Sequence, residues 1–323
     1  MSEAVLSVEN LSLRYRVPGG TVAALRNVSL AVRQGEVLGI AGESGCGKST
    51  LASAMIDLMG ANAEITSGAV CLNGCDILSL PRAERRRLRG REIAMVFQDP
   101  MTAFSPVLTV GAQLVDFQFN LDGVTGREKW SRARDMLARV GLSDPDLAMG
   151  RFPHELSGGM RQRAAIAAAL LMRPAVLIAD EPTTALDVTM EAQIVHLLRE
   201  LQADYQCAIV IVTHHLGVIA ELCDRVAVMY AGEVVEEAPV DALYHDPRHP
   251  YTRALLSCDP AGIEAATGRL PAIGGRLPDL SDLPPGCTFA ARCGIATDRC
   301  RTVPPPCVAL GPDRSALCHE VAP

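Results

Sequence analysis

The chain has 323 residues, of which 49% are hydrophobic but only 4% aromatic, so aliphatic side chains must fill most of its core. The formal net charge of -7 argues against general binding to nucleic acid or anionic lipid. No apolar stretch reaches the length of about 18 residues that suggests a membrane-spanning helix, and the first residues lack a basic, apolar leader. We therefore expect a cytosolic protein, in which eleven cysteines are not a disulfide framework.

Short apolar strands alternate with helical stretches along the first 240 residues. Strands are expected over 5–9, 22–32, 37–41, 93–97, 176–179 and 208–212, and helices from about residue 48 and over 127–140, 159–172 and 188–203. The runs at 176–179 and 208–212 are uniformly apolar, as in strands that are covered on both faces. This alternation predicts an α/β domain with a mainly parallel sheet.

The composition changes after residue 240. Prolines crowd 278–312, the helical period fades, and six of the eleven cysteines lie from Cys258 onward. We therefore expect a catalytic domain over 1–240 and a small, Cys/Pro-rich C-terminal extension over 241–323.

Residues 42–49 match the phosphate-binding loop G-x-x-x-x-G-K-[ST] at every defined position, between an expected strand and an expected helix. Backbone N–H groups of such a loop point at phosphate oxygens, and the helix N-terminus adds partial positive charge. Lys48 is expected to neutralise the β- and γ-phosphates, and Ser49 to bind Mg²⁺ through its hydroxyl. The expected nucleotide contacts are Gly42, Glu43, Ser44, Gly45, Cys46, Gly47, Lys48, Ser49 and Thr50.

Cys46 lies inside this loop, beside a lysine and a helix N-terminus. Both features favour a thiolate. We therefore expect a thiol reagent to react at Cys46 and to block nucleotide binding, and we expect ATP to protect the thiol.

Two adjacent carboxylates, Asp180 and Glu181, end the apolar strand at 176–179. Ligands of open α/β sheets bind at the carboxyl ends of strands. Asp180 suits a water-mediated contact with Mg²⁺, and Glu181 suits polarisation of the water that attacks the γ-phosphate. On its own such a pair is more often a solvated turn, but beside a phosphate loop it indicates catalysis.

The segment Leu156–Met160 precedes an expected helix. Ser157 can cap that helix, and Gly158 and Gly159 allow an anion to approach the backbone. Because a domain with one phosphate loop has no obvious need of a second anion site, this segment suggests closure on a phosphate held by another copy.

In this order and spacing, the phosphate loop, the Leu156–Met160 segment, the Asp-Glu pair and His214 after a strand resemble an ABC transporter ATPase over roughly residues 5–240. The resemblance implies a mainly parallel sheet, an antiparallel β part and a helical subdomain at about 99–172. It also implies a head-to-tail dimer, in which two ATP molecules lie between one chain's phosphate loop and the signature segment of the other.

The same resemblance implies individual roles. Tyr15 would stack on adenine, Gln98 would contact Mg²⁺ and sense a membrane partner, and His214 would bond the γ-phosphate. The cross-dimer loop would be Ala185, Leu186 and Asp187. The implied catalytic set is Glu181, His214, Lys48 and Gln98.

Three stretches, 98–102, 157–163 and 249–256, resemble the peptide-importer branch of that family. This branch contains oligopeptide, dipeptide, glutathione and nickel importers, and Met160 resembles the first of its two different ATPase subunits. The implied partners are a second ATPase subunit, two membrane permeases and an extracytoplasmic solute-binding protein, at the cytoplasmic face of a bacterial inner membrane, with no nucleic acid. Nickel and glutathione remain alternative cargoes, and a soluble ABC ATPase remains the rival class.

This sequence departs from the branch at two places. Phe104 and Ser105 replace the usual Leu-Asn pair, where the permease contact is expected. His215 follows His214, the residue expected to sense the γ-phosphate, at a position where Asp is customary in the family. The effect of His215 on the response to the γ-phosphate is left open.

Five cysteines of the extension are separated by 5, 6, 6 and 10 residues. Zinc sites usually pair cysteines across about two to four residues, whereas iron–sulfur clusters tolerate wider spacing. The peptide-importer resemblance implies a 4Fe-4S cluster held by Cys287, Cys293, Cys300 and Cys318, with Cys307 as a spare. Zinc and free or structural cysteines remain the alternatives.

Overall fold

The computed structural model describes residues 4–184, 186–258 and 272–322. The chain divides into two compact units. The helix-rich unit comprises 1–5, 33–36 and 78–211, and the phosphate-loop unit comprises 6–32, 37–77 and 212–323. Among the described residues, no helix combines the length and the apolar character needed to cross a membrane.

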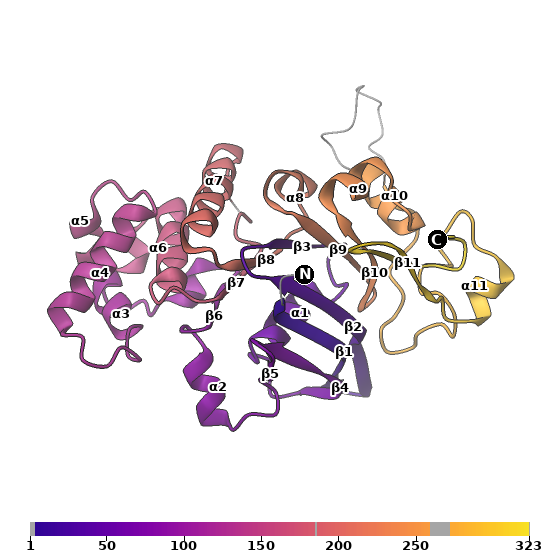
Figure 1. Ribbon diagram of the computed structural model, residues 1–323, viewed down its shortest axis with the longest axis horizontal. Helices are drawn as coiled ribbons and strands as arrows, with labels where there is room; N and C mark the ends of the chain where they lie inside the picture. Colours follow the sequence, from indigo (N-terminus) through magenta and orange to yellow (C-terminus); the bar gives the residue numbers. More distant parts are fainter. Residues whose placement is uncertain (1–3, 185, 259–271, 323) are drawn as a thin grey trace. The chain divides into compact units, whose positions relative to one another are not determined.

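The phosphate-loop unit contains two groups of strands (Figure 1). The first has the order β2-β1-β4-β5, with β1 Ala4–Val17, β2 Gly20–Arg33, β4 Ala63–Leu72 and β5 Cys75–Asp76. The second has the order β11-β12-β10-β9-β3, with β3 Val37–Ala41, β9 Arg225–Tyr230, β10 Glu233–Pro239, β11 Cys307–Gly311 and β12 Arg314–Leu317. In this second group β3 and β9 pair in parallel, whereas β9 with β10, β10 with β12, and β12 with β11 pair antiparallel. Both β3 and β9 are buried along their whole length; β3 is uniformly apolar, and β9 is apolar or aromatic after its first residue, Arg225.

Five described helices complete this unit. They are α1 Lys48–Met55, α8 Leu216–Leu222, α9 Val240–His245, α10 Pro250–Ser257 and α11 Asp298–Thr302. Because β3 leads directly into the phosphate loop and then into α1, the loop stands between a buried strand and a helix N-terminus. The sequence prediction of that strand–loop–helix order is confirmed.

The C-terminal extension contributes two strands to the phosphate-loop unit. Glu236 and Glu237 of β10 pair with Ala316 and Ser315 of β12 in antiparallel register. The sequence pattern does not predict these strands, because β11 is short and alternates between exposed and half-buried residues. The domain boundary at residue 240 stays a prediction.

The helix-rich unit places three strands in the order β8-β7-β6 among its helices. The strands are β6 Ile93–Val96, β7 Val176–Asp180 and β8 Ala208–Val212. The helices are α2 Arg82–Leu88, α3 Val110–Asp116, α4 Gly126–Arg139, α5 Pro145–Gly150, α6 Gly158–Leu170 and α7 Val188–Tyr205, with short 3-10 turns η1 Pro100–Ala103 and η2 Pro153–Glu155. Helices α3, α4 and α5 pack on one another, and α6 packs on α4 and on β6.

Local signals explain where these helices begin. Thr125 and Glu128 form a reciprocal capping box at the start of α4. Alanine fills much of the buried face of α6, which lets it pack closely. The helices expected at 127–140, 159–172 and 188–203 are therefore confirmed as α4, α6 and α7. Together, these elements confirm the predicted α/β class.

Candidate functional site

The phosphate loop is built from backbone geometry that only glycine adopts without strain. Gly42 has φ 147° and Gly47 has φ 110°. A Cβ added at Gly42 would lie 2.3 Å from the carbonyl oxygen of Met229, and one at Gly47 would lie 2.7 Å from that of Ala24. Both positions therefore need glycine for two independent reasons, the positive φ and the close approach of a neighbouring backbone.

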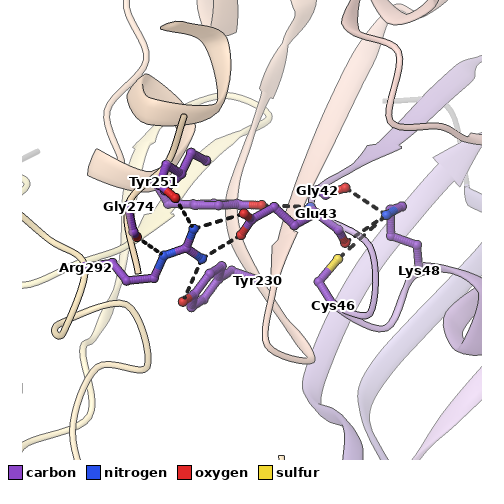
Figure 2. Close-up of polar contacts among 9 residues, drawn as sticks. Gly42, Glu43, Cys46, Lys48, Tyr230, Tyr251, Gly274 and Arg292 are labelled. Carbon is purple, nitrogen blue, oxygen red and sulfur yellow. Dashed lines mark hydrogen bonds and ion pairs between the residues drawn. The ribbon is translucent and has the colours of Figure 1, made fainter. Parts of the chain in front are cut away.

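Lys48 folds back over its own loop (Figure 2). Its Nζ donates to the carbonyl oxygens of Gly42 at 2.8 Å and Glu43 at 3.0 Å, and the residue is only 5% exposed. Ser44, Gly45 and Ser49 are exposed in the same stretch. The loop therefore holds a buried ammonium beside backbone and hydroxyl groups that solvent, or a phosphate, can reach.

Cys46 does not have the character expected from the sequence. Its side chain is fully buried, and its Sγ lies 4.0 Å from Nζ of Lys48. Burial raises the pKa of the Cys46 thiol, and this effect outweighs the opposing influence of Lys48. The predicted thiolate is therefore wrong, because the sequence shows the neighbouring charge but not the burial.

Tyr15 and His214 belong to the same unit as the phosphate loop. Tyr15 lies on β1, and its hydroxyl donates to Oγ1 of Thr50 in α1 at 3.5 Å. His214 lies between β8 and α8, exposed, with its ring edge-on to that of His215 at a centroid distance of 4.4 Å. The N–H of His215 donates to Oγ1 of Thr213 at 3.0 Å. The adenine and γ-phosphate roles of Tyr15 and His214 stay predictions.

The helix-rich unit brings Gln98 and Glu181 into contact. Nε2 of Gln98 donates to Oε2 of Glu181 at 2.9 Å, and the hydroxyl of Thr184 donates to the same oxygen at 2.9 Å. Glu181 also adopts a positive φ of 47°, which is uncommon for a residue with a side chain. Such backbone strain persists where the surroundings hold the residue in place, and here two hydrogen bonds orient the carboxylate.

Asp180 is the last residue of β7 and is 7% exposed. Glu181, the next residue, is therefore the first carboxylate that lies beyond the end of the buried strand. The sequence pattern indicates both carboxylates but not Thr184, whose position three residues after Glu181 allows its side chain to turn back to that carboxylate.

The two glycines of the signature segment, Leu156–Met160, have different surroundings. Ser157 caps α6, as expected, by accepting from the backbone N–H of Met160 at 3.3 Å. A Cβ at Gly159 would lie 1.9 Å from the terminal methyl group of Met190, whereas one at Gly158 would meet nothing within 4 Å. Gly159 therefore serves packing, and Gly158 presents an open backbone surface.

Asp187 has a structural role within this unit. Its Oδ1 accepts from the N–H of Met190 at 2.9 Å and caps α7. Ala185, which the resemblance places in the same cross-dimer loop, lies outside the described residues. The cross-dimer role of Asp187 stays a prediction.

Four cysteines of the extension line one pocket. They are Cys287, Cys293, Cys300 and Cys318, and apolar groups such as Phe289 and Ala290 share the lining. Cys307 is exposed and is not part of this lining. Burial raises the pKa of Cys287 to about 11 and also raises the pKa of Cys318.

The metal expected at these cysteines has no preformed ion site among the described residues. No group of three or more His, Cys, Asp or Glu side chains there is arranged to hold a metal ion. The pocket thus gathers the four thiols without placing them at single-ion spacing. Thiols are the ligand type that iron–sulfur clusters use, so the chemistry of the four side chains, and not their spacing, is what a cluster would need.

Comparison with known proteins places the chain in a family. The ABC transporter family model matches residues 25–184, and the model for the C-terminal region of oligopeptide/dipeptide transporters matches residues 235–300. The oligopeptide transport ATP-binding protein OppD of Haemophilus influenzae is 42% identical over 93% of this chain and 92% of its own length. The dipeptide transport ATP-binding protein DppD of Escherichia coli is 43% identical over 98% of this chain and 96% of its own length.

Solved structures agree with this assignment. The dimeric ATP-binding cassette MJ0796, in a post-hydrolysis state bound to ADP and Pi, superposes with a TM-score of 0.66 at 31% identity, over 73% of this chain and 98% of that one. The expected ATPase class is thus supported by sequence and by fold. The chain belongs to the ABC transporter ATPases, and it combines their ATP-binding domain with the C-terminal region of oligopeptide/dipeptide transporters.

Proposed function

We propose that this ATPase is the energy-coupling subunit of an importer for peptides or related small solutes. The strongest support for this role is that one chain combines an ABC domain with the C-terminal region of oligopeptide/dipeptide transporters. The relatives OppD and DppD, which match almost the whole chain, are named for oligopeptide and dipeptide transport. In such an importer, binding and hydrolysis of ATP would drive uptake across the membrane.

The phosphate loop is the proposed site for the triphosphate. Its backbone N–H groups and Lys48 would meet the phosphate oxygens, and the exposed Ser49 would offer a hydroxyl to Mg²⁺. Gln98 and Asp180 keep the Mg²⁺ roles that the family resemblance assigns to them. A hydroxyl, an amide oxygen and a carboxylate are the hard oxygen ligands that Mg²⁺ prefers. Bound Mg²⁺ would neutralise charge on the phosphates.

Glu181 is the proposed group that polarises the attacking water. Its carboxylate is held by Gln98 and Thr184, so its orientation is set before a water molecule arrives. His214 is proposed to hydrogen-bond the γ-phosphate, and Tyr15 to stack on adenine. Gln98 is suited to report occupancy, because a movement of its chain segment would disturb the carboxylate that it contacts.

The proposed partner of the nucleotide site is a second ATPase subunit in a head-to-tail dimer. The structural relative MJ0796 was solved as a dimer, and Ser157 and Gly158 present an exposed helix start. The remaining proposed partners are two membrane permeases and an extracytoplasmic solute-binding protein. This assembly would hold the chain at the cytoplasmic face of a bacterial inner membrane.

We also propose that Cys287, Cys293, Cys300 and Cys318 ligate a 4Fe-4S cluster. The pocket that these four share, and from which Cys307 is excluded, supports the choice of ligands. Because the extension has little apolar core, bonds from its cysteines to a cluster would stabilise its fold. Iron and zinc are to be quantified on anaerobically purified wild type and on five single Cys→Ser variants, with Cys307→Ser as the matched control. Stoichiometric zinc without iron, or iron lost only in Cys307→Ser, would overturn the cluster.

Uptake in cells tests the proposed transport function. The gene is deleted from its host, and accumulation of labelled dipeptide, oligopeptide, glutathione and nickel is measured with and without the restored gene. We expect peptide uptake to be lost on deletion and recovered with the wild-type chain, but not with Lys48→Ala. Normal peptide uptake after deletion, with loss of nickel or glutathione uptake, would transfer the function to that cargo.

A further inference from the structure

Arg292 connects the C-terminal extension to the phosphate loop. Nη1 donates to Oε2 of Glu43 at 2.7 Å, and Nη2 donates to Oε1 at 3.0 Å, so the pair is bidentate (Figure 2). The Arg292 side chain is only 4% exposed, and that of Glu43 is 27% exposed. Glu43 is one of the variable positions of the phosphate loop, so nothing in the loop motif requires a carboxylate there.

The guanidinium of Arg292 is fixed from several sides. Nε donates to the carbonyl oxygen of Gly274 at 2.8 Å, and Nη2 also donates to that of Ile273 at 3.2 Å. Nη1 donates to the hydroxyl of Tyr230 at 3.3 Å. The guanidinium also lies 5.7 Å from the ring centroid of Tyr230 and 5.9 Å from that of Phe289. This enclosure sets the direction in which the cation faces Glu43.

A second contact holds the backbone of the same loop residue. The N–H of Glu43 donates to the hydroxyl of Tyr251 at 2.9 Å, and Tyr251 is fully buried against Tyr230 and Phe289. The carbonyl oxygen of Glu43 accepts from Nζ of Lys48. Arg292 therefore holds the side chain of Glu43, and Tyr251 holds its N–H. The carbonyl oxygen of Glu43 in turn holds Lys48.

The ion pair between Arg292 and Glu43 changes the electrostatics of the phosphate loop. A carboxylate within a phosphate-binding loop repels a triphosphate, because like charges at short range raise the free energy of the bound state. A bidentate guanidinium neutralises that carboxylate and also fixes its position. A loop that is fixed before its ligand arrives does not lose conformational freedom on binding.

We propose that Arg292 is a positioning residue for ATP binding: by neutralising and holding Glu43, together with Tyr251, it makes the C-terminal extension part of the nucleotide site. This inference rests on the proposed role of the phosphate loop. The coupling acts in both directions, so bound ATP stabilises the extension to the same degree that the extension favours ATP.

The test compares charge-removing variants of the two partners. Binding of a non-hydrolysable ATP analogue with Mg²⁺ is measured by calorimetry on the full chain, at low and high salt. Arg292→Gln exposes the carboxylate, and we expect about a 10-fold weaker affinity. Glu43→Gln frees the loop in the same way but removes the repelling charge itself, so its loss of affinity should be clearly smaller than that of Arg292→Gln. The double variant should recover most of the loss in Arg292→Gln.

Salt and a matched control separate charge from mere loss of structure. Because salt screens repulsion, the defect of Arg292→Gln should shrink as ionic strength rises. Arg299→Gln, at an exposed arginine of α11, should bind like wild type. A purely structural contact would weaken binding equally in Arg292→Gln and Glu43→Gln, without salt dependence, and that result would overturn the proposal.

Two further variants separate the role of Arg292 from misfolding and from the nucleotide site itself. If Arg292→Gln does not fold, Tyr251→Phe removes only the hydroxyl that accepts from Glu43, and we expect roughly 3-fold weaker binding. Wild-type affinity in Tyr251→Phe would then overturn the proposal. Lys48→Ala tests the underlying function by itself: unchanged analogue binding there would remove the nucleotide site. Loss of binding in Lys48→Ala with wild-type affinity in Arg292→Gln at both salt concentrations would refute only the role of Arg292.

Discussion

Nε2 of Gln98 lies 2.9 Å from Oε2 of Glu181 and donates a hydrogen bond to it. The two residues are 83 positions apart in the chain, and each follows a buried strand of the helix-rich unit. Since β6 and β7 are parallel neighbours, their carboxyl ends lie at the same edge of the sheet. The contact therefore follows from the pairing of these strands.

The hydroxyl of Thr184 is predicted to matter for turnover. Thr184→Val keeps the shape of the side chain but removes the donor to Glu181. We expect kcat to fall roughly 10-fold with KM for ATP nearly unchanged, because only the orientation of the carboxylate is disturbed. Steady-state phosphate release measures both constants.

Thr66→Val provides the control for that experiment, because it removes an exposed hydroxyl hydrogen bond on β4. It should leave kcat within about 2-fold of wild type, as expected for a surface substitution. Equal kcat values for wild type and Thr184→Val would show that Thr184 does not position Glu181.

Cys46 is predicted to resist alkylation in the folded protein. Its thiol is buried and its pKa is raised, so little thiolate is present at neutral pH. Iodoacetamide labelling followed by mass spectrometry should find rapid modification of the exposed Cys75 and Cys307. Modification of Cys46 should require denaturant. If Cys46 is instead labelled rapidly, and ATP prevents this labelling, then Cys46 is a reactive thiolate and the prediction is wrong.

His249 is predicted to make stability depend on pH. The residue is 1% exposed, and its Nδ1 accepts from the N–H of Tyr251 at 3.0 Å. Burial lowers the pKa of His249 from 6.5 to about 4. Between these values the unfolded chain binds more protons than the folded one, so the free energy of unfolding falls as the pH falls. The loss accumulates to on the order of 3 kcal/mol across the window.

Denaturant unfolding of wild type and His249→Asn, from neutral pH to pH about 4, measures this effect. Asn keeps an acceptor at the start of α10 but does not titrate in that range. The stability advantage of wild type over the variant should therefore shrink as the pH falls. Two curves that stay parallel throughout the window would assign the pH dependence to other groups.

The sequence predicts those features that depend on neighbours along the chain. The phosphate loop, the cap at Ser157 and the strands around Glu181 are all local patterns, and the structure has them where expected. The contact between Arg292 and Glu43 joins residues 249 positions apart, so no local pattern reveals it. The burial of Cys46 is equally invisible in the sequence, because it depends on how Met229 and other distant residues pack on the loop.

The most direct test of the proposed catalytic site is ATP hydrolysis by Glu181→Gln. Phosphate release with Mg²⁺ and binding of radiolabelled ATP are measured on wild type, Glu181→Gln and Lys48→Ala, each assembled with its partner subunits. Glu181→Gln should retain ATP but lose hydrolysis by about 10²- to 10⁴-fold, as expected when a general base is removed. Lys48→Ala should lose both. Near-normal phosphate release by Glu181→Gln would contradict the assignment of Glu181 as the group that activates water.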